Sequence, residues 1–245
     1  MPLTHDDKIR YGRQMLIPGW GEEGQEKLKG SRVFIAGAGG LGSPVSIYLA
    51  VAGIGELAIC DADRIELSNL NRQILHPDAR VGELKALSAA STLGGLNPDI
   101  KITAHSDYID EASVARLVGQ PDAVVDCLDN FETRYLLNRY CLERGIPFVH
   151  GAVSGMIGQV TFVSAPETPC LRCVFPHAPP KELFPVLGAT PGIIGTIQAM
   201  EVLKHLTGVG ETLKGTLLIF EGDEMAFTPI KAKRAPDCPD CGHLG

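Results

Sequence analysis

The sequence predicts a doubly wound α/β fold built on a mostly parallel sheet. Three observations support this prediction: short apolar runs alternate with helical segments through about the first 150 residues, a glycine-rich turn follows the first run directly, and 44% of the 245 residues are hydrophobic. Strands and helices that alternate at this spacing form parallel sheets packed between helices. A chain of this length and composition can bury a sizeable core.

The elements of the first 152 residues are expected from local patterns. Residues 32–36 form a short apolar run that ends in glycines, which is typical of a buried parallel strand. One helix is expected to stop at Gly94-Gly95 and another at Gly145, because glycine favours helix ends. The predicted elements are two short helices within residues 5–29 separated at Pro18-Gly19, strands at 32–36, 56–60, 100–104, 123–126 and 148–150, and helices at 41–51, 83–93, 111–118 and 131–144.

The pattern changes after about residue 152. Residues 153–163 and 215–227 are expected as strands with antiparallel hairpin spacing, and residues 168–191 as a proline-rich loop or crossover. An amphipathic helix is expected between these two strands. Its apolar face consists of Ile193, Ile194, Ile197, Met200, Leu203 and Leu206. We therefore expect one domain over residues 1–245, with N-terminal helices at 1–30, a Rossmann-like nucleotide-binding part at 31–152 and an antiparallel C-terminal extension at 153–245.

Composition excludes several classes of protein. The formal net charge of −7 and the pI near 5.5 argue against binding to nucleic acid, which requires clustered positive charge. No apolar run reaches the roughly 18 residues that a membrane-spanning helix needs. The N-terminus is polar and mixed in charge, so it is not a signal peptide. We expect a cytoplasmic location and no contact with membrane.

The glycine-rich turn has the spacing of a nucleotide-binding loop. Gly37, Gly39, Gly40 and Gly42 lie between a predicted strand and a predicted helix, and Asp61 ends the next strand. Such a loop lets the backbone approach a phosphate at the helix N-terminus, while the acid accepts hydrogen bonds from ribose hydroxyls. The alternative is a packing turn that holds no ligand. The sequence contains no G-x-x-x-x-G-K-[ST] motif, so it is not a P-loop ATPase.

Cationic and polar residues around this loop do not suit NAD, which the glycine motif alone would indicate. Arg72 and Lys85 follow the second strand and could both reach a polyphosphate, whereas each taken singly could be a solvated surface residue. Asp129 follows the fourth strand, at the sheet edge where ligands bind, and could hold magnesium. It could instead cap the next helix in a capping box with Glu132, and the two roles are compatible.

Two C-x-x-C pairs predict a structural zinc site. Four thiolates fill the tetrahedral coordination of Zn²⁺ and leave no open position, and His177 and His243 lie nearby as spare ligands. The alternative is a set of reduced thiols without metal. The predicted zinc ligands are Cys170, Cys173, Cys238 and Cys241.

These motifs together resemble the ThiF/HesA/MoeB family of adenylyltransferases in molybdopterin and thiamine biosynthesis, which are related to ubiquitin-activating enzymes. The match covers nearly the whole chain in order and at matching spacing. The residues that carry the resemblance are RYGRQ at 10–14, GAGGLGS at 37–43, LSNLNRQ at 67–73, GELK at 82–85, DCLDNFETR at 126–134, GTIQAME at 195–201 and the two C-x-x-C pairs.

The resemblance implies that the enzyme activates a small ubiquitin-like sulfur-carrier protein at its C-terminal Gly-Gly. The carrier carboxylate would attack the α-phosphate of ATP and form an acyl-adenylate, with the C-terminal part at 153–245 binding the carrier. The implied site residues are Asp61 at the ribose, Asn69, Arg72 and Lys85 at the phosphates, Asp129 at Mg²⁺, and Arg13 reaching the ATP of the other subunit of a homodimer.

One departure from the family affects the chemistry. Thiamine-type members carry a further cysteine in the loop after the first C-x-x-C, and residues 174–191 contain none. The other three cysteines (Cys60, Cys127 and Cys141) lie on predicted strands or a helix, where burial in the core is expected. We therefore expect adenylate formation without a covalent adduct, no appended rhodanese domain, and a separate sulfur donor such as a cysteine desulfurase or a rhodanese-like protein.

Three alternatives remain at this point. A transfer-RNA-modifying dehydratase of the same superfamily is disfavoured by the low positive charge and the paired cysteines. An NAD-dependent oxidoreductase leaves Arg13, Arg72, Lys85 and Asp129 without a role. A non-catalytic scaffold that binds a ubiquitin-like partner would consume no ATP.

Overall fold

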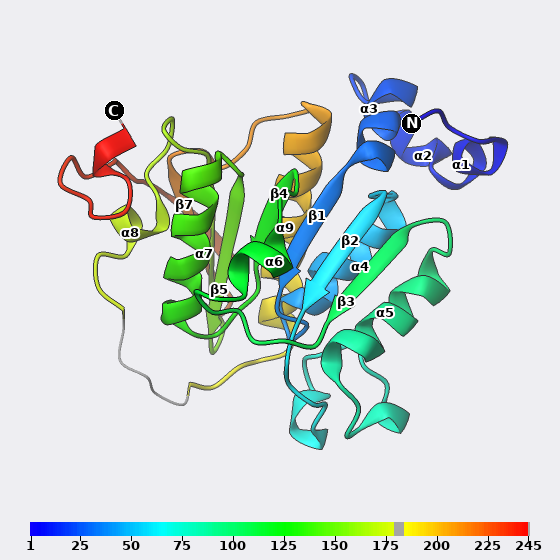
Figure 1. Ribbon diagram of the computed structural model, residues 1–245, viewed down its shortest axis with the longest axis horizontal. Coiled ribbons are helices and arrows are strands. Elements are labelled where there is room, and N and C mark those ends of the chain that lie inside the picture. Colours follow the sequence, from blue (N-terminus) through cyan, green and yellow to red (C-terminus); the bar gives the residue numbers. More distant parts are fainter. Residues whose placement is uncertain (179–183, 245) are drawn as a thin grey trace.

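A single mixed sheet forms the centre of the molecule in the computed structural model, which describes residues 1–178 and 184–244 (Figure 1). Its eight strands lie in the order β3-β2-β1-β4-β5-β6-β7-β8. Their bounds are β1 Arg32–Ala36, β2 Glu56–Cys60, β3 Lys101–His105, β4 Ala123–Asp126, β5 Phe148–Ser154, β6 Ile157–Val163, β7 Thr216–Glu221 and β8 Ala226–Lys231.

The first five strands pair in parallel, as the sequence predicts. β1 lies between β2 and β4, with Val33 opposite Leu57 on one side and Ala123 on the other. The chain passes from β1 outward to β2 and β3, then returns across the sheet to β4 and β5. Loops that follow β1 and β4 therefore meet at one edge of the sheet, at the point where the direction of winding reverses.

The antiparallel extension is confirmed, but each of its two predicted strands is in fact a hairpin. Residues 153–163 contain a turn at Gly155, whose φ of 61° is left-handed, and Ser154 pairs with Ile157 across it. Residues 215–227 likewise turn before β8, where Met225 has a φ of 52°. Both turns lie at breaks in the apolar pattern, Ser154-Gly155 in the first segment and the polar residues 221–224 in the second, but the prediction treated each segment as one strand. β8 is the outer strand, and most of its residues are exposed.

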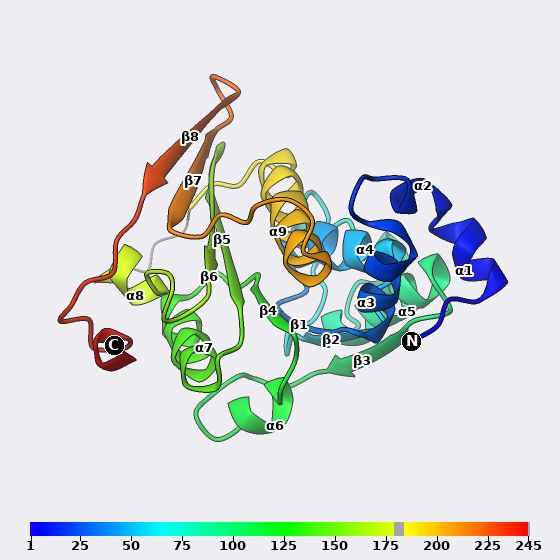
Figure 2. The same ribbon diagram turned by 90° about the horizontal axis from the view of Figure 1, so that it is seen from above.

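Helices cover both faces of the sheet (Figure 2). Successive side chains of a strand point to opposite faces of the sheet, so alternate residues of β1 pack against the helices on opposite faces. Val33 and Ile35 pack with α3, α4, α5 and α9, whereas Phe34 and Ala36 pack with α6, α7 and α8. These helices are α3 Gly21–Gly30, α4 Gly42–Ala52, α5 Lys85–Leu96, α6 Val114–Val118, α7 Phe131–Arg144, α8 Leu171–Val174 and α9 Ala189–Thr207.

Several helix boundaries differ from the prediction. α5 continues through Gly94-Gly95, because the buried Leu93 anchors its last turn. It ends at Leu96, and Asn97, which lies just before a proline, is its C-cap. α6 starts later than expected, because the Asp110 carboxylate accepts hydrogen bonds from the backbone of the next turn. α8 and the first three residues of α9 lie inside the predicted loop at 168–191. Residues 179–183 of that loop lie outside the described residues.

The N-terminal segment contains three helices where two were predicted. α1 His5–Arg10 and α2 Gly12–Met15 are separated by Tyr11, and α3 follows the predicted break at Pro18-Gly19. Tyr11 is buried, and its hydroxyl accepts a hydrogen bond from Asn97 Nδ2 at 2.8 Å. Among the described residues, no helix is both long enough and apolar enough to cross a membrane.

Candidate functional site

The glycine-rich loop joins β1 to α4 in a conformation that requires glycine at two positions. Gly37 has a φ of 101°, and a Cβ atom there would lie 2.7 Å from the Cys127 carbonyl oxygen. A Cβ atom on Gly42 would collide with the backbone carbonyl of Gly37. These close approaches bring the backbone of the loop against the segment that follows β4, and they explain the spacing of the motif.

Four consecutive backbone amides of this loop have no hydrogen-bond acceptor among the residues that the structure describes. They are the N–H groups of Gly39, Gly40, Leu41 and Gly42. Gly39 and Gly40 are half-buried, so a ligand can approach this part of the loop from the solvent. Unpaired N–H groups at the start of a helix, with the positive end of the helix dipole behind them, bind phosphate. The loop therefore has the geometry of an anion cradle.

The Asp61 side chain is hydrogen-bonded to the backbone of the loop. One carboxylate oxygen accepts from Ala38 N at 2.8 Å, and the other from Asp63 N at 2.9 Å. Burial raises the pKa of Asp61, and the charge of Lys85 opposes this rise. Because each carboxylate oxygen has a second lone pair, the side chain can still accept a hydrogen bond from a sugar hydroxyl.

Lys85 starts α5 and is buried, with only 7% of its surface exposed. Its ammonium group lies 3.0 Å from an oxygen of Asp63, a residue to which the sequence assigned no role. Asp61, Asp63 and Lys85 thus form one charged group beside the glycine loop. A buried ammonium is available to a phosphate only if it exchanges or shares this partner.

Arg72 lies beside the loop but turns its guanidinium toward its own segment. A Cβ atom on Gly40 would lie 3.6 Å from Arg72 Cγ, whereas Nη1 donates to Ser68 O and Asn71 Oδ1, each at 2.9 Å. The side chain is partly exposed, so a rotation about its flexible stem would bring the guanidinium to the loop amides.

Asn69 and Gln73 support this segment. Asn69 is buried at the end of a short 3₁₀ helix, and its Oδ1 accepts from Glu66 N at 3.1 Å. Gln73 was not predicted as a site residue. It is buried beside Gly39, and its Oε1 has no hydrogen-bond partner among the described residues. A buried polar group that lacks a partner is unusual, so Gln73 is a further candidate for ligand contact.

Asp129 is exposed after β4, and the capping alternative for it is wrong. Asn130 is the N-cap of α7, because its Oδ1 accepts from Thr133 N at 2.9 Å. The Asp129 carboxylate makes no hydrogen bond or ion pair within residues 1–178 and 184–244. Asp129 lies two residues after Cys127, which contacts the glycine loop, and a free carboxylate at this edge of the sheet is a suitable ligand for Mg²⁺.

A buried charged network lies at the end of β4, three residues before Asp129. Asp126 Oδ2 lies 2.6 Å from His150 Nδ1 and 3.3 Å from Arg134 Nε, and all three side chains are almost completely buried. Arg134 also donates to the carbonyls of Leu128 and Gly151. Burial lowers the pKa of His150, although its contact with Asp126 acts in the opposite direction. The sequence placed these residues on strand ends and a helix, but gave no sign that they meet.

Arg13 is separated from the other predicted site residues. It lies on α2, whose neighbouring residue Gln14 donates to Ala52 O at the C-terminal end of α4. The glycine loop is at the N-terminal end of the same helix, and an 11-residue helix is about 16 Å long. Arg13 is exposed and does not reach the glycine loop of its own chain.

The four cysteines of the C-x-x-C pairs meet, although the pairs are far apart in sequence. All four Sγ atoms lie within 4.8 Å of one another, and three of the distances are 3.4, 3.6 and 3.8 Å. Ligands 2.3 Å from a tetrahedral zinc ion are about 3.8 Å apart, so the cluster fits such an ion. Within the described chain, neither His177 nor His243 belongs to the cluster.

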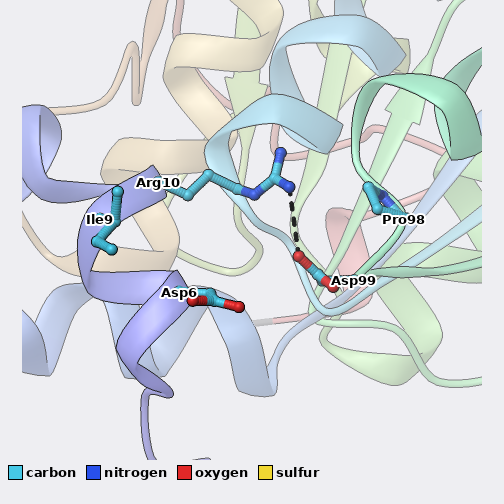
Figure 3. Close-up of a pocket in the computed structure, with 5 residues that line it drawn as sticks. All are labelled: Asp6, Ile9, Arg10, Pro98 and Asp99. Atoms are coloured by element: carbon cyan, nitrogen blue, oxygen red, sulfur yellow. Dashed lines mark ion pairs between the residues drawn. The ribbon is translucent and has the colours of Figure 1, made fainter.

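A shallow hollow near the N-terminus is not part of this site (Figure 3). It is lined by Asp6, Ile9, Arg10, Pro98 and Asp99. Arg10 points across it to Asp99, and the two side chains form an ion pair at 3.4 Å. The only cation in its lining is therefore already neutralised, which gives an anionic ligand little to bind.

The sequence is similar to those of two curated proteins. The SAMP-activating enzyme E1 of Haloferax volcanii is 46% identical over 242 residues, which cover 96% of this chain and 89% of that protein. The adenylyltransferase and sulfurtransferase MOCS3 of Drosophila sechellia is 44% identical over 246 residues, which cover 98% of this chain. The chain spans only 54% of the length of that second relative.

Solved structures of MccB from E. coli share the fold. A complex named MccB + MccA-N7isoASN superposes with a TM-score of 0.87 at 26% identity, covering 96% of this chain and 75% of that one. MccB + ATP superposes with a TM-score of 0.84 at 25% identity, covering 95% and 73%. The model of the ThiF family matches residues 11–240, which is most of the sequence. The chain belongs to the ThiF family.

Proposed function

We propose that this chain transfers the adenylyl group of ATP to the C-terminal carboxylate of a small ubiquitin-like sulfur carrier that ends in Gly-Gly. The observation that carries the proposal is the row of unpaired amides at Gly39–Gly42, with Arg72 and Lys85 beside it. The relatives named as a SAMP-activating enzyme and as adenylyltransferase MOCS3 support the same reaction class.

The reaction joins two anions, so its main requirement is charge neutralisation. A carboxylate oxygen of the carrier attacks the α-phosphorus of ATP and forms a new P–O bond, while the bond from that phosphorus to the bridging oxygen breaks and pyrophosphate leaves. A C-terminal carboxyl group is already ionised at neutral pH, so no general base is needed. Loop amides, Arg72 and Lys85 would stabilise the negative charge that gathers on the phosphates.

Asp129 is the residue that we assign to magnesium, and Asp61 the one that we assign to the ribose of ATP. When bound, Mg²⁺ would supply further positive charge against the phosphate oxygens. Asp129 suits this role because it is exposed and unpaired in the described chain, and because it lies two residues after Cys127, which contacts the loop. Asn69 would contact the phosphates from the segment that carries Arg72.

We propose a homodimer in which Arg13 completes the site of the partner. The argument is the position of Arg13 at the end of α4 that is remote from its own glycine loop. An exposed arginine there can serve an active site only if a second chain brings its own loop to it. We place the carrier on the C-terminal part at 153–245, where the antiparallel strands leave exposed residues.

We assign zinc to the cluster of Cys170, Cys173, Cys238 and Cys241, with a structural role because four thiolates fill its coordination. Reduced cysteines and ATP as substrate are typical of the cytoplasm, which is the location that we propose.

The chain would release the adenylate without forming a covalent adduct of its own. Burial raises the pKa of the Cys60 thiol to about 12, and it also raises those of Cys127 and Cys141. The attacking species is the thiolate, so these buried thiols are poor nucleophiles. A separate sulfur donor, such as a cysteine desulfurase or a rhodanese-like protein, would then complete the transfer.

The proposal is tested by exchange of labelled pyrophosphate into ATP, with and without a Gly-Gly-ended carrier. We expect exchange that depends on the carrier and is lost in Arg72→Ala and Asp129→Ala, each by a factor of about 100 or more, as for the loss of a charge-stabilising group. A carrier that lacks the last glycine serves as control. Full activity in both variants would show that the assigned site is wrong, and absence of exchange with every carrier would overturn the proposed reaction.

A further inference from the structure

We infer that His76 is a positioning residue that orients the amides of the glycine loop toward the phosphates. The inference rests on the proposed use of this loop to bind ATP. His76 follows the segment that carries Arg72 and is buried, with 4% of its surface exposed. No role was assigned to it from the sequence.

The ring of His76 joins the loop to α5. Its Nε2 lies 2.8 Å from Ala38 O, and its Nδ1 lies 3.1 Å from Ser88 Oγ. A carbonyl oxygen can only accept, so Nε2 must carry the proton that the ring donates to Ala38. Burial lowers the pKa of His76, which keeps the ring neutral, so Nδ1 is left to accept from the Ser88 hydroxyl. One tautomer therefore satisfies both contacts.

The contact with Ala38 fixes the direction of the next amide. The peptide between Ala38 and Gly39 is planar and trans, so its C=O and N–H groups point in opposite directions. Because the carbonyl points to the buried His76 ring, the Gly39 N–H points away from the ring. That amide is the first of the four that have no acceptor in the described residues. Asp61 holds the other side of Ala38 by accepting from its N–H.

Ser88 is itself held in place. Arg80 donates to Ser88 O at 2.9 Å and to Thr92 Oγ1 at 3.0 Å, which ties the turn before α5 to the helix. The chain of contacts therefore runs from the start of α5 through one imidazole to the loop backbone. Without the histidine, the Ala38 carbonyl would be a buried acceptor with no partner, and the peptide could rotate to find one.

The test compares His76→Leu with His76→Gln, because a glutamine amide can still donate to Ala38 O whereas leucine cannot. We expect His76→Leu to bind ATP with Mg²⁺ about tenfold more weakly in calorimetry, which is the loss of one such hydrogen bond. His76→Gln should stay within about threefold of the natural protein, and Ser88→Ala should lie between the two. In pyrophosphate exchange, His76→Leu should raise KM for ATP and leave kcat nearly unchanged, because the charged groups remain.

His205→Leu is the matched control, because this partly buried ring on α9 packs against Phe162 and does not contact the loop. Circular dichroism and thermal melting confirm that each variant is folded, and Ser88→Ala carries the test if His76→Leu does not fold. Unchanged ATP affinity in folded His76→Leu, or in Ser88→Ala in its place, would overturn the inference alone. A natural protein that does not bind ATP would overturn the proposed function as well.

Discussion

At the residue scale, Gly37 and Gly42 fix the shape of the glycine loop, because a side chain at either position would collide with a neighbouring carbonyl group. Since the backbone geometry leaves no alternative to glycine at these two positions, the loop could be predicted from the sequence. The ion pair of Lys85 with Asp63 could not be predicted, since no sequence pattern indicates a contact between two residues that are 22 positions apart. Asn130 rather than Asp129 caps α7, because either side chain suits an N-cap and only the backbone decides between them. The roles assigned to these residues remain predictions.

Replacement of Gly42 by alanine tests the close approach within the loop. The added methyl group would collide with the carbonyl of Gly37, so the loop must open and its amides must move. We expect a loss of ATP affinity of at least about tenfold, measured by calorimetry. Gly95→Ala is the control, because a Cβ atom there meets nothing and should leave binding unchanged. Equal affinity in both variants would contradict the described loop geometry.

Buried and partly buried histidines should make the protein less stable in mild acid. Burial lowers the pKa values of His76, His105 and His205 below the usual 6.5. Between those lowered values and 6.5 the unfolded chain binds more protons than the folded one, so the free energy of unfolding falls as pH decreases. Urea denaturation at pH 7.5 and pH 5.5 should show the lower midpoint at pH 5.5. An unchanged or higher midpoint would mean that these rings do not control stability in this range.

At the scale of elements, strand and helix types were predicted more accurately than their ends. Every parallel strand was identified, because an apolar run that is buried on both faces has a strong signal. Helix ends such as that of α5 depend on packing of Leu93 in the core, which local glycines do not reveal. The turn between β5 and β6 lies at Ser154-Gly155, where one left-handed glycine reverses the chain inside a segment that was predicted as one strand.

The buried network of Asp126, Arg134 and His150 holds the loop between β4 and α7. Replacement of Arg134, its cation, tests this role. Arg134→Met leaves the Asp126 charge buried with less compensation, so we expect a loss of stability of about 3–5 kcal/mol in urea denaturation. The double variant Asp126→Asn, Arg134→Met should recover part of that loss, because it removes the uncompensated charge. A single variant as stable as the natural protein would show that the ion pair does not hold this loop.

At the scale of the whole molecule, the topology could be predicted because βαβ connections have few allowed arrangements. The meeting of the two cysteine pairs was predicted from their spacing pattern and from the chemistry of zinc. The position of Arg13 relative to the glycine loop could not be predicted, because it depends on how α2 packs against the far end of α4.

Metal removal tests the link between α8 and the C-terminal tail. Cys241→Ser should lower the zinc content from about one ion per chain, since a tetrahedral site loses one of its four ligands. We also expect a lower melting temperature, because the tail is then no longer tied to α8. Cys141→Ser, which alters a buried thiol outside the cluster, is the control and should keep its zinc. Equal zinc content in both variants would contradict a four-cysteine site.

The outer strand β8 bears on how the protein behaves at high concentration. An exposed strand at the margin of a sheet is a template onto which another molecule can add its own strand, and repetition of this step builds fibres. β8 contains Pro229, which has no N–H to offer to an incoming strand, and it ends in Lys231. A proline and a terminal charge on this margin oppose edge-to-edge growth, so β8 can stay exposed without the addition of strands from other molecules.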